Sequence, residues 1–375
     1  MAQAILQFGT GRFLQAHVDL FVSQALLRGE AIGGISVVQS TGNANSSARL
    51  AALEALADGP GYCVDIRGQR HGEPVTQTVL VDSVREAWHA ERDWARVMEA
   101  VATKVQVIVS NTADQGYRLN EADDASSLSD GAPAARSFPA KLLALLHHRW
   151  RLVPAAPLSL YPCELVSRNG DTLRELVAKL GERWGAPPAF IAYLRGHCVW
   201  LNSLVDRIVS APLYPVGAVA EPYALWAIER QARMVLPCTH PAIVLTDDLA
   251  TFERRKLWLL NLGHSMLAER WLVDQRPRDE TVLQAMNDPP LRGILESVWR
   301  DEVMPVLAAS GDDAEAYLAE VRDRLLNPFL EHRLADIAND HAQKKQRRFA
   351  PVIELAERLA LPLPQPRLRE ALGGR

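Results

Sequence analysis

A pair of glycines near the start of the chain has the spacing that binds a nucleotide phosphate. The apolar segment at residues 4–8 ends in Gly9-Thr10-Gly11, and a segment compatible with a helix follows at once. In such a junction the first glycine permits a tight turn and the second lets a phosphate approach bare backbone. The start of the helix adds N–H groups and the positive end of its dipole. Leu14 stands where the third glycine of the usual fingerprint would be, so the motif alone is also compatible with an ordinary glycine-rich turn.

Three polar side chains interrupt an apolar helical segment later in the chain. Lys256, Asn261 and His264 stand among leucines and a tryptophan. At about 100° per residue they share one helix face, within an arc of about 140°. Polar groups on such a face must either be satisfied by hydrogen bonds or be used in binding and catalysis. Because Lys256 and His264 would lie about 12 Å apart along a regular helix, their convergence requires the lysine to curl back or the helix to begin irregularly.

The first two-thirds of the chain alternate strand-like and helix-like segments, which predicts a parallel sheet with crossover helices. The expected strands are residues 4–8, 35–39, 75–84, 105–110, 157–161 and 199–201, and the expected helices are residues 13–28, 46–57, 91–103 and 138–151. The strand at 105–110 ends in Ser110-Asn111-Thr112. This is either a plain polar turn or a ligand-contacting tip at the carboxyl edge of the sheet.

From about residue 248 the pattern becomes helical throughout. The expected helices are residues 249–272, 279–286, 291–307, 313–326 and 349–359. Apolar residues at spacings of three and four predict a buried stripe along the first of them. We therefore expect an α/β domain at residues 1–247 and an all-α domain at residues 248–375.

Length, composition and charge narrow the class of protein. The chain has 375 residues, 48% of them hydrophobic and 23% charged, which is an ordinary globular composition for about two or three domains. A net charge of −4 gives no basic footprint, so we expect no nucleic-acid partner. Four scattered cysteines without a C-x-x-C pair fit a reducing cytoplasm. No window approaches about 18 uninterrupted apolar residues, so we expect no membrane contact.

Three motifs together resemble the signatures of the long-chain polyol dehydrogenases. FGTGRFLQAH at residues 8–17 is similar to their F-G-x-G-x-F-x-R-x-H, and LNSLVDRI at 201–208 resembles their Asn followed by x-x-V-D-R-I. KLWLLNLGH at 256–264 resembles K-x-x-x-x-N-x-x-H, and residues 324–329 resemble the family's R-x-x-N-P element. The family includes mannitol dehydrogenase, fructuronate reductase and tagaturonate reductase. The opening segment and Ser110-Asn111-Thr112 resemble the last of these most closely.

The resemblance implies a Rossmann-type N-terminal domain and metal-independent hydride transfer between a nicotinamide and a secondary alcohol or ketone. Lys256 would be the general acid or base at the substrate oxygen. Asn202 and Asn261 would donate hydrogen bonds to that oxygen as it becomes alkoxide-like, and His264 would orient the adjacent hydroxyl. The residues implied for the dinucleotide are Phe8, Gly9, Thr10, Gly11, Arg12, Phe13, Gln39, Ser40, Asn111 and Thr112.

The chain departs from the family pattern in two places. Gln15 stands where arginine is common. After the expected second strand, Gln39-Ser40 offers no acidic side chain for the adenosine ribose hydroxyls, the usual mark of NAD. No arginine stands directly beside that strand end for a 2′-phosphate either, and Arg49 follows only some residues later. The resemblance to tagaturonate reductase favours NAD, with NADP still open.

Cationic side chains suggest an acidic substrate. Arg207 follows Asp206 and could hold a carboxylate through two hydrogen bonds or form an internal salt bridge with that aspartate. The basic run at residues 344–348 has the pattern of a solvated face. Its place near the family's substrate contacts nevertheless leads us to expect that His332 and Lys345 meet an acidic sugar.

We therefore expect an oxidoreductase that interconverts a keto-hexuronate, such as tagaturonate or fructuronate, with its aldonate. A neutral polyol dehydrogenase of the mannitol or arabinitol type is the alternative within the class. A dinucleotide-binding regulator without catalysis is the alternative outside it. A metal enzyme finds no support, because no pair among the ten histidines has ligand spacing with cysteines or carboxylates. Monomer and dimer are equally compatible with the composition.

Overall fold

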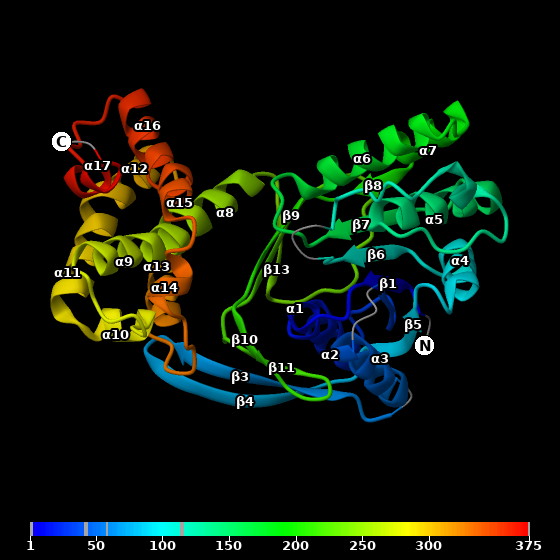
Figure 1. The fold of residues 1–375 in the computed structure, drawn as a ribbon, viewed down its shortest axis with the longest axis horizontal. Helices are drawn as coiled ribbons and strands as arrows, with labels where there is room; N and C mark the ends of the chain where they lie inside the picture. Colours follow the sequence, from blue (N-terminus) through cyan, green and yellow to red (C-terminus); the bar gives the residue numbers. More distant parts are fainter. Residues whose placement is uncertain (1–2, 41–43, 58, 113–115, 374–375) are drawn as a thin grey trace. The chain divides into compact units, whose positions relative to one another are not determined.

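The computed structural model describes residues 3–40, 44–57, 59–112 and 116–373 (Figure 1). No helix in these ranges has the length and apolar character needed to span a membrane. The same ranges contain no cluster of three or more histidine, cysteine or acidic side chains arranged to hold a metal ion.

Six parallel strands form the main sheet in the order β5-β2-β1-β6-β7-β8 (Figure 1). The strands are β1 Ile5–Phe8, β2 Ile35–Gln39, β5 Val84–His89, β6 Val107–Ser110, β7 Leu158–Pro162 and β8 Cys198–Trp200. Every residue of β1, β2, β6 and β7 is buried, as expected for a parallel sheet with both faces covered by helices. The strand order reverses at β1, which creates the crevice where doubly wound sheets bind ligands.

The helices of this first unit alternate with the strands along the chain, and the four α-helices between residues 94 and 196 share one apolar core with the sheet. The helical elements of the unit are α1 Arg12–Gln15, α2 Val18–Arg28, α3 Ala44–Leu56, α4 Trp94–Thr103, the 3₁₀ turn η1 Ala125–Leu128, α5 Phe138–Leu152, α6 Asn169–Arg183 and α7 Pro188–Gly196. The prediction of one continuous helix at residues 13–28 was wrong, because two helices, α1 and α2, are separated at Ala16-His17. The His17 imidazole bonds the carbonyl of Leu225 there, at 3.1 Å.

Two smaller sheets were not predicted. One has the order β10-β11-β3-β4 and the other β13-β12-β9. Their strands are β3 Tyr62–Arg70, β4 Glu73–Val81, β9 Ser203–Asp206, β10 Val209–Pro212, β11 Ala218–Ala220, β12 Leu225–Glu229 and β13 Ile243–Thr246. The prediction of one strand at residues 75–84 was therefore wrong. This stretch contains most of β4 and the first residue of β5, and only β5 joins the parallel sheet.

The C-terminal part is helical, as predicted, and encloses its own apolar core. Its elements are α8 Leu249–Arg255, η2 Lys256–Asn261, α9 Leu262–Val273, α10 Val282–Asn287, α11 Pro289–Val298, η3 Trp299–Val303, α12 Met304–Ala309, α13 Glu315–Leu325, α14 Leu334–Ile337, α15 His341–Arg348, α16 Ala350–Arg358 and α17 Pro366–Ala371. Both η2 and η3 are π-helical, so the continuous helices predicted at 249–272 and 291–307 are each interrupted. The predicted fold class, a parallel-sheet domain followed by helices, is confirmed.

The two compact units do not correspond to a single cut in the sequence. The first comprises Met1–Ile66, Gln77–Ala220 and Ala224–Leu249, whereas the second takes Arg67–Thr76 and Glu221–Tyr223 in addition to Ala250–Arg375. Within the second unit, the R-x-x-N-P element holds these distant segments. Arg324 pairs with Glu221 at 2.8 Å, and Asn327 donates to the carbonyl of Arg67 at 3.3 Å. The domain boundary expected between residues 247 and 248 stays a prediction.

Candidate active site

The carboxyl ends of three neighbouring strands bring the predicted dinucleotide residues together. In the sheet register, Phe8 at the end of β1 lies opposite Val38 of β2 and Ser110 of β6. The segments that leave these strands therefore emerge at one edge of the sheet. These segments carry residues 8–13, Gln39-Ser40 and Asn111-Thr112, and this edge is where open α/β sheets bind ligands.

The two glycines of the first motif meet different constraints. Gly9 has a φ of +119°, and a Cβ there would lie 2.6 Å from the backbone oxygen of Asn111. Only glycine fits that position. A Cβ on Gly11 would meet nothing within 4 Å, so this backbone is open to a ligand. The geometry matches a turn in which one glycine makes the bend and the other admits a phosphate.

Gln15 stands where the family motif commonly has arginine, and its buried side chain holds the Gly-x-Gly turn in place. Its side chain is buried, and its amide nitrogen donates to the carbonyl of Thr10 at 2.9 Å. Its amide oxygen accepts from the N–H of Gly217 at 3.1 Å. Thr10 in turn donates through its hydroxyl to Gln39 at 3.2 Å, which links the turn to the end of β2. The substitution therefore serves the geometry of the loop.

A buried carboxylate holds the polar tip that follows β6. Glu164 accepts from the N–H and the hydroxyl of Thr112 at 3.0 and 2.9 Å and from the hydroxyl of Ser110 at 3.0 Å. Burial raises the pKa of Glu164, against the opposing effect of these hydrogen bonds. Asn111 donates to the carbonyl of Cys163 at 2.8 Å. Glu164 and Asn111 thus tie the tip after β6 to the loop after β7.

A cavity of about 720 Å³ opens beside the Gly-x-Gly turn. Its lining comes from the turn itself, from α3 and from the β10–β11 connection: Gly11, Arg12, Gln15, Asn45, Ala48, Arg49 and residues 212–217. Ligand sites commonly occupy about 300–1,000 Å³. Together with the open backbone at Gly11, this cavity fits part of a dinucleotide.

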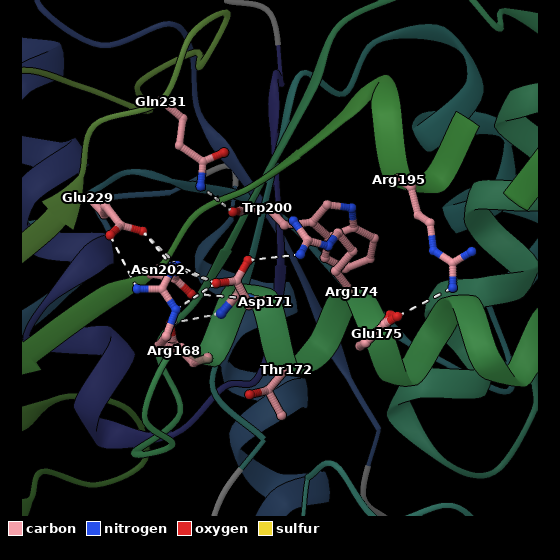
Figure 2. A network of polar contacts seen from close by, with 12 residues as sticks. Arg168, Asp171, Thr172, Arg174, Glu175, Arg195, Trp200, Asn202, Glu229 and Gln231 are labelled. Atoms are coloured by element: carbon pink, nitrogen blue, oxygen red, sulfur yellow. Dashed lines mark hydrogen bonds and ion pairs between the residues drawn. The ribbon is translucent and has the colours of Figure 1, made fainter. Parts of the chain in front are cut away.

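Asn202 lies at the centre of a polar network in the same unit (Figure 2). Its side chain is fully buried, and its amide nitrogen donates to Glu229 at 2.7 Å and to Asp171 at 3.1 Å. Arg168 bridges the same two carboxylates, at 2.6 Å from Asp171 and 3.4 Å from Glu229. Burial pushes the pKa of Asp171 upward, but the bonds from Asn202 and Arg168 outweigh it and hold that pKa below its usual value. Both amide hydrogens of Asn202 are therefore engaged.

Arg207 is buried and donates to the carbonyl of Ala16 at 2.6 Å. This contact connects the second predicted motif with the end of the first. A bond to a main-chain carbonyl is what a structural arginine makes. The substrate role expected for Arg207 stays a prediction.

Lys256 and Asn261 are the first and last residues of a π-helical segment in the second unit. A π turn bonds residues five apart, which is the separation of these two. The indole N–H of Trp299 donates to the Leu259 carbonyl within this segment at 3.2 Å. A Cβ on Gly263 would lie 2.8 Å from the Trp299 ring, so glycine is needed for this packing. π turns inside helices often coincide with functional sites.

His264 and His332 lie against each other in the same unit. Their ring centroids are 4.8 Å apart and their planes meet edge to face, at 62°. His264 is 7% exposed, and burial lowers the pKa of His332. The structure thus brings two predicted site residues together from segments far apart in the sequence.

The basic run of α15 packs against α9 and η2 instead of forming a solvated face. Lys345 and His341 both contact Glu269, at 2.9 and 2.7 Å. Arg348 donates to the Asn261 carbonyl at 3.0 Å and to Ser265 at 2.7 Å, and its burial lowers the pKa of its guanidinium. Sequence reasoning selected Lys345 and missed Arg348, because nothing in the run distinguishes the arginine that reaches the π-helix.

Two family sequence models match most of the chain. The one described as the mannitol dehydrogenase Rossmann domain matches residues 3–237. The one described as the mannitol dehydrogenase C-terminal domain matches residues 248–368.

Known proteins resemble the chain over most of its length. An altronate oxidoreductase of Yersinia enterocolitica is 30% identical over 98% of this chain and 78% of its own length. That of Halalkalibacterium halodurans is 29% identical over 94% and 70%.

Among solved structures, a substrate-free D-sorbitol dehydrogenase has a TM-score of 0.82 at 21% identity, covering 100% of this chain and 81% of its own. A Pseudomonas fluorescens mannitol 2-dehydrogenase, solved with NAD and D-mannitol, has a TM-score of 0.72 at 18% identity, covering 100% and 84%. These two likenesses show the fold. The two family models, which together match most of the chain, show that it belongs to the mannitol dehydrogenase family.

Proposed function

We propose that the protein interconverts a keto-hexuronate, such as tagaturonate or fructuronate, with its aldonate by hydride exchange with NAD(H). The observation that carries the proposal is the likeness to altronate oxidoreductases over 94–98% of the chain. Family membership makes the protein an NAD-dependent oxidoreductase that acts on a CH–OH group. The proposal adds the class of substrate and the residues that act on it.

The residues that would hold the dinucleotide lie along the edge formed by the ends of β2, β1 and β6. When bound, its nicotinamide supplies the hydride acceptor or donor. The backbone at Gly9, Thr10, Gly11 and Arg12 would receive the phosphates. The remaining contacts come from Phe8, Phe13, Gln39, Ser40, Asn111 and Thr112. The forced turn at Gly9 and the open approach at Gly11 support this assignment.

Lys256 exchanges a proton with the substrate oxygen, and Asn261 donates a hydrogen bond to the same oxygen as it gains negative charge. Their positions at the two ends of one π-helical segment support a common target. His264 orients the adjacent hydroxyl. If Asn202 also donates to the substrate oxygen, one of its amide hydrogens must first leave Asp171 or Glu229, which hold both of them.

The cationic side chains proposed to meet the substrate carboxylate are Lys345, His332 and Arg207. Lys345 is bonded to Glu269, so a substrate carboxylate competes with that pair for its ammonium group. The contact between His332 and His264 supports a place for His332 beside the catalytic segment. For Arg207, the bond to Ala16 makes a purely structural role the alternative.

NADH absorbance during mixing with tagaturonate, fructuronate, fructose or mannitol tests the proposal. We expect consumption of NADH with a keto-hexuronate. Lys256→Ala should lose about 10²–10⁴-fold in turnover while still binding NADH. Lys179→Ala, at an exposed lysine of α6, is the matched control and should behave like the wild type.

The other possible outcomes would contradict the proposed substrate class or the proposed role of Lys256. Turnover of fructose or mannitol alone would identify a neutral polyol dehydrogenase. NADH binding without turnover of any of the four compounds would favour a dinucleotide-binding regulator. Full activity of Lys256→Ala would remove the lysine from the mechanism.

A further inference from the structure

The cavity beside the Gly-x-Gly turn carries positive charge only. Arg12 and Arg49 line it, and no carboxylate is among the described residues of its lining. Neither arginine forms a salt bridge in the described part of the chain. Many other arginines of this protein are paired with an acidic side chain, as Arg168 and Arg324 are. Two arginines without such partners in one concave site indicate that an anion belongs there.

Arg49 is fixed in position at this site. It lies on α3, is half-buried, and donates from its Nη1 to the Thr10 carbonyl at 3.2 Å. The Thr10 carbonyl also accepts from Gln15 at 2.9 Å, so both side chains are anchored on the turn that follows β1. A guanidinium has five N–H donors. The bond to Thr10 uses one of them and leaves donors for a ligand.

The end of β2 lacks the group that would oppose a second phosphate. In NAD-specific sheets an acidic side chain near this point binds the ribose hydroxyls and repels a 2′-phosphate. Here Gln39 is buried and accepts from Thr10. The Ser40 hydroxyl is buried without a hydrogen-bond partner in the described structure. Both side chains are neutral, so nothing at the described end of β2 repels an added phosphate.

The same cavity offers a surface for a purine. Tyr214 lines it from the β10–β11 connection and is 84% exposed. An exposed aromatic ring in a concave, cationic site can stack on a nucleotide base. A base, a ribose and a phosphate could then be contacted from three different segments of the first unit.

We propose that Arg12 and Arg49 form a subsite for the 2′-phosphate of NADP(H), so that the protein binds NADP(H) as well as NAD(H). This inference rests on the proposed function for the existence of a dinucleotide site. The pyrophosphate is received by the glycine backbone, which leaves the two guanidinium groups for the phosphate on the adenosine ribose. Arginine suits this task because its planar fork makes paired hydrogen bonds to phosphate oxygens.

Binding of small fragments tests the subsite without any sugar substrate. Calorimetric titration compares adenosine 2′,5′-bisphosphate with 5′-AMP on the wild type, Arg12→Gln, Arg49→Gln and the double variant. We expect each single variant to lose about tenfold or more in affinity for the bisphosphate and less than about twofold for 5′-AMP. Arg183→Ala, at an exposed arginine of α6 outside this cavity, removes the same charge and should change neither affinity.

The remaining outcomes are distinct. Equal losses for both nucleotides would assign the arginines to the phosphate shared by the two and overturn the inference. Unchanged affinities would overturn it as well. Retained 5′-AMP binding shows that a variant is folded. Because titration needs no turnover, failure of every sugar substrate would remove the proposed function and leave the subsite result standing.

Discussion

The side-chain amide of Asn202 donates to the carboxylate of Glu229 at 2.7 Å, inside a network that contains a second carboxylate and one bridging arginine (Figure 2). A neutral donor between two carboxylates fixes both of them without adding charge. Whatever Asn202 does during a reaction, its resting position is set by these acceptors.

Replacing Asn202 tests this reading of the network. Asn202→Ala should cost about 1–3 kcal/mol, because the half-buried carboxylates of Asp171 and Glu229 lose the buried amide that donates to both of them. Asn202→Asp should cost more near pH 8, since it places a third carboxylate beside Asp171 and Glu229. The difference between the two variants should shrink toward pH 5, where the crowded carboxyl group takes up a proton. Urea unfolding at both pH values measures this, and an Asp variant as stable as the wild type would contradict it.

Replacing Gly9 should mainly lower stability, whereas replacing Gly11 should mainly lower the affinity for NADH. Gly9→Ala should lower stability by about 1–2 kcal/mol from its backbone conformation alone, with a further cost from contact with Asn111. Gly11→Ala has open space around its new methyl group, so its stability should be nearly unchanged while its affinity for NADH falls. Thermal unfolding and NADH titration separate the two effects. Equal NADH affinity in Gly11→Ala and the wild type would argue against phosphate binding at this backbone.

Asp19 should make stability depend on pH. Burial raises its pKa from 3.8 to about 7, although Tyr62 donates to it at 2.6 Å. Because the folded state holds this proton more tightly than the unfolded state, the contribution favours folding at low pH. It is lost as the pH rises from about 4 to 7, at about 1.4 kcal/mol per pKa unit.

Asp19→Asn removes this titration. The variant should gain stability relative to the wild type between pH 5 and pH 8 in urea unfolding. A constant difference between the two proteins over that range would show that the carboxyl group titrates normally. Asp301→Asn, at an exposed carboxylate whose pKa is lowered by its hydrogen bonds from Arg300, serves as the control and should show no such gain.

Removing one partner of the buried Arg324–Glu221 pair should lower the free energy of unfolding strongly, whereas replacing both partners with apolar side chains should lower it only slightly. Their side chains are 2% and 1% exposed, so Arg324→Met deprives a buried carboxylate of this guanidinium and should cost about 3–5 kcal/mol. The double variant Arg324→Met/Glu221→Leu should recover most of that loss. Denaturant unfolding of both single variants and the double variant measures the coupling. Additive losses would contradict a direct interaction.

Local pattern was enough to predict the fold class of this protein. Hydrophobic periodicity and turn residues determine structure over only a few neighbouring positions. Residues 4–13 therefore predict a strand, a glycine turn and the start of a helix. The change near residue 248 from alternating strand-like and helix-like segments to helical periodicity predicts the helical C-terminal part. Motif spacing also selected Lys256, Asn261 and His264, and their roles remain proposals to be tested by the variants described above.

Long-range pairing was beyond the reach of local pattern. β11 pairs with β3, and a strand's periodicity does not say which distant strand it meets. Asp171 and Glu229 lie 31 and 27 residues from Asn202, and Arg348 lies 87 residues from the Asn261 carbonyl it binds. Such partners are chosen by the packing of whole elements.

The π-helical start of the segment that carries Lys256, Asn261 and His264 shows the same difference between local and long-range information. The sequence determined that Lys256, Asn261 and His264 would share an apolar helix, because their spacing alone fixes that. Only the tertiary structure decided that the helix widens between Lys256 and Asn261. A π turn is unfavourable by itself, and here Trp299 stabilises it by bonding the Leu259 carbonyl and packing against Gly263. That contact joins residues 40 positions apart, and its energy comes from burial in the folded core.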